Sequence, residues 1–166
     1  RRPVSVMLRK ELLELLKTGR LLIVTGVMVS FGILGPAAAR YLPQLMEGQL
    51  PEGMQIIMPE PVPADGVQQF LENVGQLGWI ALILVTMGAL AGERAAGTVA
   101  VVLATPVSRS SFVVAKLISR LLLLLVSVVA GAAVCILYTG LLLGAYPLPE
   151  FLAATGLYVL YGALVV

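Results

Sequence analysis

Four long apolar stretches, separated by charged segments, are the main pattern of this sequence. They cover residues 21–39, 75–92, 121–145 and 151–166, and none of them contains a charged residue. The hydrocarbon core of a bilayer is about 30 Å thick and is crossed by roughly 20 helical residues. We therefore predict an all-α, polytopic helical membrane protein with four transmembrane helices in this part of the chain.

The fourth stretch is predicted to be an incomplete span. It begins at Phe151 and is still apolar at Val166, where the sequence stops. Because it is shorter than the roughly 20 residues that a span needs, we expect about two more spans beyond Val166. The chain also begins with Arg1 instead of Met, which is typical of a piece of a longer protein, although processing also explains such a start.

Lysine and arginine are concentrated in two of the polar segments. Six of the 11 precede residue 21, four lie within residues 93–120, and residues 40–74 contain only Arg40. Cytoplasmic flanks of membrane proteins hold an excess of basic residues. The N-terminus and residues 93–120 are therefore predicted to be cytoplasmic, and residues 40–74 to face outward, in a multi-pass protein of the cell (inner) membrane.

Residues 1–20 predict an amphipathic helix ahead of the first span. Apolar residues recur at helical spacing on one face, and charged residues lie opposite. The apolar face comprises Val4, Leu8, Leu12, Leu15 and Leu16, and the charged face comprises Lys10, Glu14 and Lys17. Such a helix lies at the inner membrane surface. It acts there either as a lever that moves the first span or as a passive anchor.

Proline is concentrated in the segment that is predicted to face outward. Five of the 10 prolines fall within residues 40–74, so regular structure should be short there. We expect Asp65 to cap a helical piece over residues 66–76 that leads into the second span. We also expect Pro36 to bend or end the first transmembrane helix. The outer loop either gates a substrate or forms a lid without substrate contact.

The composition removes most enzyme chemistry. Hydrophobic residues make up 59% of the chain and charged residues 12%. These 166 residues include no histidine, one cysteine (Cys135) and one aspartate (Asp65). Serine–histidine and cysteine–histidine catalysis, histidine-based zinc sites, aspartyl dyads and intrachain disulfides are thereby excluded within them. We predict no catalytic, cofactor-binding or metal-ligating residue, and the net charge of +2 is too small to indicate a nucleic-acid partner.

Small and polar residues within the apolar stretches are expected to serve packing. Pairs of small residues four apart permit close approach of helices, within the chain or at a dimer seam, and we favour the former. These pairs are Gly88 and Gly92, Ser127 and Gly131, and Gly140 and Gly144. Most hydroxyl groups in the spans, such as those of Thr25 and Ser30, should bond to the carbonyl group four residues earlier. Cys135 is expected to be a small core residue.

The polar segment between the second and third stretches is too short to hold another span. Residues 95–108 are uncharged, but they are fewer than a membrane-crossing helix needs. The chain must therefore return to the same side. Pro106 should end one short helix, and Ser108 or Ser110 can cap a second helix that passes Lys116 and enters the third span. The apolar face of the first short helix needs cover from lipid or from a protein partner.

Short motifs recur in order around these cytoplasmic segments. They are Lys10-Glu11-Leu12 before the first span, Glu93, Arg94, Gly97 and Thr98 at the inner end of the second, Pro106, Ser108 and Arg109 after it, and Lys116 before the third. In order and spacing these motifs resemble those of the permease subunits of type-2 ATP-binding-cassette (ABC) transporters, which are mostly exporters. In that family the stretch after the second span forms a coupling helix that docks on an ATPase subunit, and six spans are usual.

The resemblance implies a transport permease and not an enzyme. The coupling interface is then expected at Glu93, Arg94, Gly97, Thr98, Pro106, Ser108, Arg109 and Lys116. The expected partners are a cytoplasmic ABC ATPase subunit, which holds ATP and Mg²⁺, and a second permease copy or homologous permease in the lipid bilayer. A membrane anchor or assembly scaffold remains an alternative, as does a secondary transporter. The latter would be expected to place ionisable residues within its spans, and these spans have none.

Overall fold

The computed structural model describes residues 3–47, 60–84, 87 and 109–165, and every regular element in these ranges is helical. The all-α prediction is therefore confirmed for the described part of the chain. In chain order the elements are α1 (Pro3–Lys17), α2 (Arg20–Glu47), α3 (Pro63–Asn73), the π-helix η1 (Val74–Gly78), α6 (Arg109–Leu142) and α7 (Leu148–Val165). Residues 79–84, which follow η1, are also α-helical.

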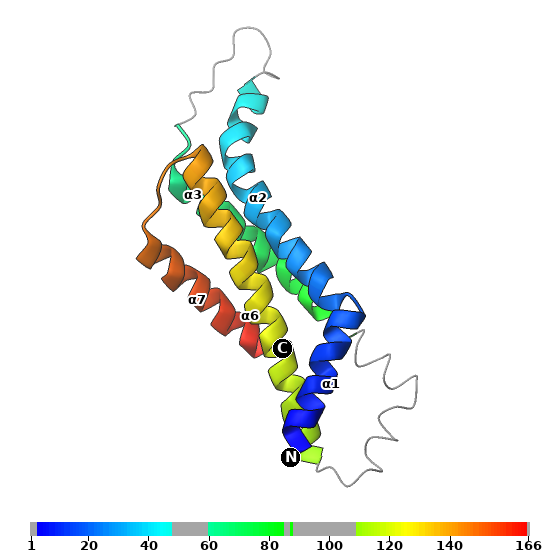
Figure 1. The fold of residues 1–166 in the computed structure, drawn as a ribbon. Helices are drawn as coiled ribbons and strands as arrows, with labels where there is room; N and C mark the ends of the chain where they lie inside the picture. Colours follow the sequence, from blue (N-terminus) through cyan, green and yellow to red (C-terminus); the bar gives the residue numbers. More distant parts are fainter. Residues whose placement is uncertain (1–2, 48–59, 85–86, 88–108, 166) are drawn as a thin grey trace.

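Three of the described helices are rich enough in apolar residues to lie in a membrane. The segments Arg20–Met46 of α2 and Ser110–Leu142 of α6 are long and apolar enough to cross one, and Leu148–Leu164 of α7 is a shorter apolar helix. Figure 1 shows α2 and α6 side by side along the long axis of the molecule, with α7 returning toward α6.

The backbones of α2 and α6 touch at two glycines. A Cβ atom at Gly32 would collide with the carbonyl oxygen of Gly131, and a Cβ atom at Gly131 would lie 2.6 Å from the carbonyl oxygen of Met28. On the same pair of helices, the hydroxyl oxygens of Thr25 and Ser127 lie 3.0 Å apart in a hydrogen bond. The small residues Ser127 and Gly131 therefore pack within the chain. Thr25 differs from the prediction, because its hydroxyl group bonds across the helices.

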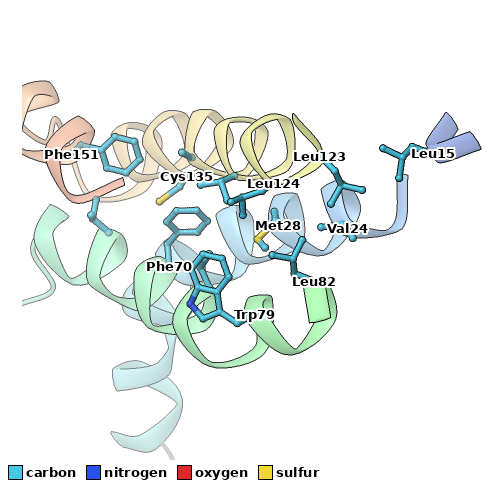
Figure 2. Close-up of a cluster of buried hydrophobic side chains, with 14 residues drawn as sticks. Leu15, Val24, Met28, Phe70, Trp79, Leu82, Leu123, Leu124, Cys135 and Phe151 are labelled. Carbon is cyan, nitrogen blue, oxygen red and sulfur yellow. The ribbon is translucent and has the colours of Figure 1, made fainter. Parts of the chain in front are cut away.

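A continuous set of apolar side chains fills the space between α2, α3, residues 79–84 and α6 (Figure 2). The members with the least exposure are Val24, Met28, Phe70, Val74, Leu82, Leu123, Leu124, Val128 and Cys135. Cys135 is fully buried, as predicted for a small core residue, and its Sγ atom lies 3.9 Å from the Thr139 hydroxyl oxygen.

Helix α2 continues through both of its prolines. Pro36 and Pro43 lie inside the helix, which ends at Glu47, so Pro36 does not end the first long helix. The upper, cyan part of α2 runs in a different direction from the lower part (Figure 1). A proline removes one backbone hydrogen bond and crowds the preceding turn, and it therefore bends a helix that packing holds together.

Helix α3 packs its backbone against α2. A Cβ atom at Gly35 of α2 would lie 2.9 Å from the backbone nitrogen of Phe70, and one at Gly66 of α3 would lie 3.2 Å from the Cα atom of Pro36. Asp65 was predicted to stand just before the helix, but α3 begins at Pro63 and Asp65 lies in its first turn. The backbone N–H of Val62 donates to Asp65 Oδ2 at 2.8 Å. Proline at the first helical position sets φ for the helix and places its start two residues before Asp65.

Glycines in left-handed conformations connect the helices at both ends of the bundle. Gly19 (φ 70°) lies between α1 and α2, and Gly144 (φ 104°) follows α6. The backbone N–H groups of Leu143 and Gly144 both donate to the carbonyl oxygen of Thr139, which closes the last turn of α6. A side chain at either glycine would strain this backbone conformation.

The glycine contact between α2 and α6 predicts different effects on stability for two glycine-to-alanine substitutions in α6. Gly131→Ala places a methyl group against the backbone of Met28, and we expect the free energy of unfolding to fall by about 2 kcal/mol. Gly140→Ala, at a position with open space around it, should leave stability unchanged or raise it slightly through helix propensity. Unfolding of the purified protein in detergent measures both. Equal stability of the two variants would contradict the proposed role of the contact.

Candidate coupling site

The site residues expected from the sequence fall into two groups. Glu93, Arg94, Gly97, Thr98, Pro106 and Ser108 lie outside the described residues. Arg109 is the first residue of α6, and Lys116 lies two helical turns further along the same helix. Among the expected interface residues, Lys116 is therefore the one whose side-chain environment the structure describes.

Lys116 forms an ion pair with Glu11 of α1. The Nζ atom of Lys116 lies 3.5 Å from Glu11 Oε2, and the two side chains are only 11% and 4% exposed. The Lys116 ammonium group also lies 5.2 Å from the centre of the Phe112 ring, within the range of a cation–π interaction. The structure thus brings together two motifs that lie about one hundred residues apart, Lys10-Glu11-Leu12 and the lysine before the third span.

Glu11 and Lys116 are one end of a chain of ion pairs that links three helices. Lys10 lies 3.8 Å from Glu11 and 3.7 Å from Glu14, and Arg20 donates a hydrogen bond to Glu14 at 3.3 Å. Lys10 is 45% exposed, so its pairs add little to stability. The pair of Glu11 and Lys116 has little access to water, and the loss of one partner would leave a buried charge.

The orientation of α1 explains why Glu11 is buried. Figure 1 shows α1 beside the lower end of α6. Glu11 meets Lys116 of that helix, and Leu15 is also buried, while Val6, Leu13 and Leu16 are exposed. The sequence pattern assigned Leu16 to the apolar face expected at the membrane surface and gave Glu11 no position on either face. A carboxylate enters a buried face at low cost only when a cation meets it there. The pairing cation comes from α6, and a pattern within residues 1–20 cannot reveal it.

The described residues offer no metal-binding group. No cluster of three or more histidine, cysteine, aspartate or glutamate side chains lies within these ranges. The chemistry that the site does offer is electrostatic. A fixed carboxylate on α1 holds a fixed ammonium group on α6, close to the start of that helix.

Reversal of one charge in this pair should release α1 from α6. Lys116→Glu places two carboxylates at the buried contact, which costs on the order of 3 kcal/mol of docking free energy. We expect spin labels at the exposed positions Val6 and Val113 to move apart and to show a broader range of distances. Electron–electron resonance of the purified protein measures this change.

Two further variants separate the ion pair from a general effect of charge. The double variant Glu11→Lys with Lys116→Glu restores opposite charges and should restore the original distance. Lys17→Glu makes the same change of charge on the exposed face of α1 and should leave the distance unchanged. A wide distance in the double variant would show that the ion pair does not hold α1.

Comparisons with known proteins identify the family. The model of the family described as ABC-2 family transporter protein matches residues 6–166. The chain is also 30% identical over 160 residues to the uncharacterized transmembrane protein YxlG of Bacillus subtilis (strain 168). That alignment covers 95% of the chain and 62% of the relative, so the chain spans less than two thirds of the relative's length. No solved structure matches. By the family match and by its relative, this chain belongs to the ABC-2 transporter family of membrane proteins.

Proposed function

We propose that this chain is part of the permease subunit of an ATP-driven ABC transporter that exports its substrate. A separate cytoplasmic ATPase subunit binds ATP and Mg²⁺, and a second copy or a homologous permease completes the pathway. Membership of the ABC-2 family and the long apolar helices α2 and α6 support the permease role. The chain's own contribution is to convert movement of the ATPase into movement of these helices.

The buried ion pair between Glu11 and Lys116 carries this proposal. Helix α6 begins at Arg109, within residues 93–120, which we propose as the coupling segment. A displacement of that segment reaches α6 through the covalent chain and reaches α1 through the ion pair. Because α1 ends at Lys17 and α2 begins at Arg20, α2 follows the same displacement. Both long helices thereby respond to one docking event.

The exposed face of α1 supports a position at the inner membrane surface. Val6 and Leu13 are exposed apolar residues on one side of α1, and Arg9 and Lys17 are exposed on the same side. Apolar side chains interleaved with basic residues suit the boundary between acyl chains and anionic headgroups. We therefore place the N-terminus in the cytoplasm, with residues 93–120 on the same side and residues 40–74 outside.

Cysteine labelling in intact cells tests this orientation. In a background with Cys135→Ala, a cysteine at Glu60 should react with a membrane-impermeant reagent, because the outward segment carries few basic residues. A cysteine at Ser108 should react only after the membrane is made permeable. Reaction of the Ser108 variant in intact cells would reverse the proposed topology.

Substitutions in the coupling segment test the function itself. Gly97→Trp adds a large side chain where a docked helix needs close approach, so we expect transport-linked ATPase activity to fall severely while the permease still accumulates in the membrane. Glu93→Ala should also reduce coupling. The activity of the reconstituted full-length complex is the measurement, and the expression level and co-purification of the ATPase subunit are recorded alongside.

A matched variant shows whether bulk alone has this effect. Gly156→Trp adds the same side chain on α7 at a position with open space around it, and it should leave coupling unchanged. Normal coupling in both Gly97→Trp and Glu93→Ala would refute the permease proposal and favour a membrane anchor or assembly scaffold.

A further inference from the structure

Helix α3 and η1 carry polar side chains along one face, at the spacing of neighbours on a helix surface. We call this set the polar stripe, and its members are Asp65, Gln68, Gln69, Glu72, Asn73 and Gln76. Gln69 and Asn73 are half-buried, and the other four are exposed. The polar stripe therefore runs from the first turn of α3 into the π-helix.

The opposite face of the same segment packs against the bundle. Gly66, Val67, Phe70 and Val74 are all buried. Phe70 points into the apolar cluster between α3 and α6 (Figure 2). The segment is thus amphipathic, and α2 and α6 cover its apolar side.

Helix α7 covers a second side of this segment. A Cβ atom at Gly75 would lie 3.2 Å from the Tyr158 ring. The indole ring of Trp79, which follows η1, stacks with Tyr158 at 6.5 Å and meets Tyr161 edge-on at 5.6 Å. The polar stripe lies on the side that the described parts of α2, α6 and α7 leave uncovered.

The contact with α2 gives the depth of the polar stripe. Arg20 and Arg40 bound the uncharged part of α2, which is roughly 30 Å long and matches the hydrocarbon core. A Cβ atom at Gly78 would lie 3.0 Å from the Cε atom of Met28, and Met28 lies roughly 18 Å along the helix from Arg40. Gln76 is roughly 3 Å closer to Arg40 than Gly78 is. Gln76 therefore lies near the middle of the membrane core.

The contact with α6 gives a similar depth. Pro63 begins α3, and its Cγ atom would lie 3.8 Å from a Cβ atom at Gly144, which follows α6. Figure 1 shows α3 starting near the upper end of α6. The helical segment from Pro63 to Gln76 is roughly 20 Å long, and Glu72 lies roughly 6 Å before its end. Both contacts thus place Glu72 and Gln76 at the depth of the hydrocarbon core.

Water suits this surface better than lipid or a dry protein contact. Carboxylate and amide groups find no hydrogen-bond partners among acyl chains. Gln68 Nε2 donates to Glu72 Oε1 at 2.9 Å, which uses only part of the hydrogen-bonding capacity of either side chain. A dry protein contact would have to supply a matching partner for each remaining group, because partly satisfied polar networks are unfavourable. Water supplies partners to all of them.

We propose that the polar stripe lines a water-filled cavity of the assembled transporter, which opens outward and reaches the middle of the membrane, and that Glu72 makes it favour cations over anions. The charged members of the polar stripe, Asp65 and Glu72, are both acidic. The proposal rests on the proposed permease function and deepens it, because such a cavity is the outward part of a pathway for a polar substrate. It also explains how a segment of the outward side lies at the depth of acyl chains.

Cysteine accessibility in intact cells tests the cavity. The full-length protein carries alanine in place of Cys135 and of any other cysteine, and single cysteines are then introduced. Impermeant methanethiosulfonates react with the thiolate, which forms where water reaches the sulfur atom. We expect Gln76→Cys and Gln69→Cys to react from outside within tenfold of the rate of Glu60→Cys. Labelling after denaturation gives the total amount of each variant.

Leu34→Cys is the matched control for depth. Leu34 is an exposed apolar residue of α2 beside Gly35, which contacts Phe70, so it lies closer to the outer end than Gln76 does. If acyl chains cover it, Leu34→Cys should react at least a hundredfold more slowly than Gln76→Cys. Equal rates at these two positions, or no reaction of Gln76→Cys while Glu60→Cys reacts, would overturn the cavity.

Reagents of opposite charge test the role of Glu72. The ratio of the rates of the trimethylammonium and sulfonate reagents with Gln76→Cys is divided by their ratio with a free thiol. Glu72 lies one helical turn from Gln76, and a carboxylate about 6 Å away changes this ratio roughly tenfold in water. Glu72→Gln should therefore lower the preference for the cation roughly tenfold. Glu60→Gln removes a carboxylate elsewhere and should leave the preference unchanged.

The membrane potential acts equally on both charge variants, so their difference isolates Glu72. An unchanged ratio in Glu72→Gln would overturn the preference for cations. The assay records accessibility without ATP hydrolysis or transport. Failure at Gln76 with normal coupling would therefore reject the cavity alone, whereas loss of the proposed coupling would leave the labelling pattern as it is.

Discussion

The backbone contact between α2 and α6 at Gly32 and Gly131 is the constraint on which the rest of the structure depends. In a membrane, helices gain little from the hydrophobic effect, because lipid tails are as apolar as leucine, and close packing must supply the stability. Two glycines that face each other let the backbones touch, and the hydrogen bond between Thr25 and Ser127 lies at the same seam. Once α2 and α6 are fixed side by side, α3 packs against α2 at Gly35 and α1 is brought beside the lower end of α6. The positions of α3 and α1 therefore depend on the contact between α2 and α6.

The buried ion pair uses this fixed geometry. Glu11 and Lys116 come from distant parts of the chain and meet where α1 packs on α6, and their mutual contact offsets the cost of burying both charges. The exposed members of the ion-pair chain, such as Lys10, contribute little free energy by comparison. Leu15 is buried in the core beside this pair, so packing as well as charge holds α1 to α6, which suits a helix that we propose to transmit movement.

The sequence predicted the elements of the fold better than it predicted their contacts. The long apolar helices α2 and α6 follow from runs of uncharged residues, because length and hydropathy are local properties. Whether Pro36 ends the helix or only bends it depends on tertiary packing, which keeps α2 helical past the proline. The start of α3 depends on Pro63, which the pattern around Asp65 did not weigh. Lys116 was expected at the coupling interface by resemblance alone, and its partner Glu11 was visible only as part of a motif. Residues 93–108 lie outside the described residues, so the remainder of the expected interface stays a prediction.

Trp79 shows most clearly why contacts between distant helices cannot be predicted from the sequence. Its partners Tyr158, Tyr161 and Gly162 lie about eighty residues later, and no periodicity links them. The sequence does contain one signal, since Gly75, Gly78 and a single tryptophan occur together at the start of a span, where small residues permit close approach of a large ring. That signal does not specify which helix supplies the ring's neighbours. Among the described residues the indole N–H is buried without an acceptor, and only the packed structure reveals this, because whether a donor meets an acceptor depends on its surroundings and not on its residue type.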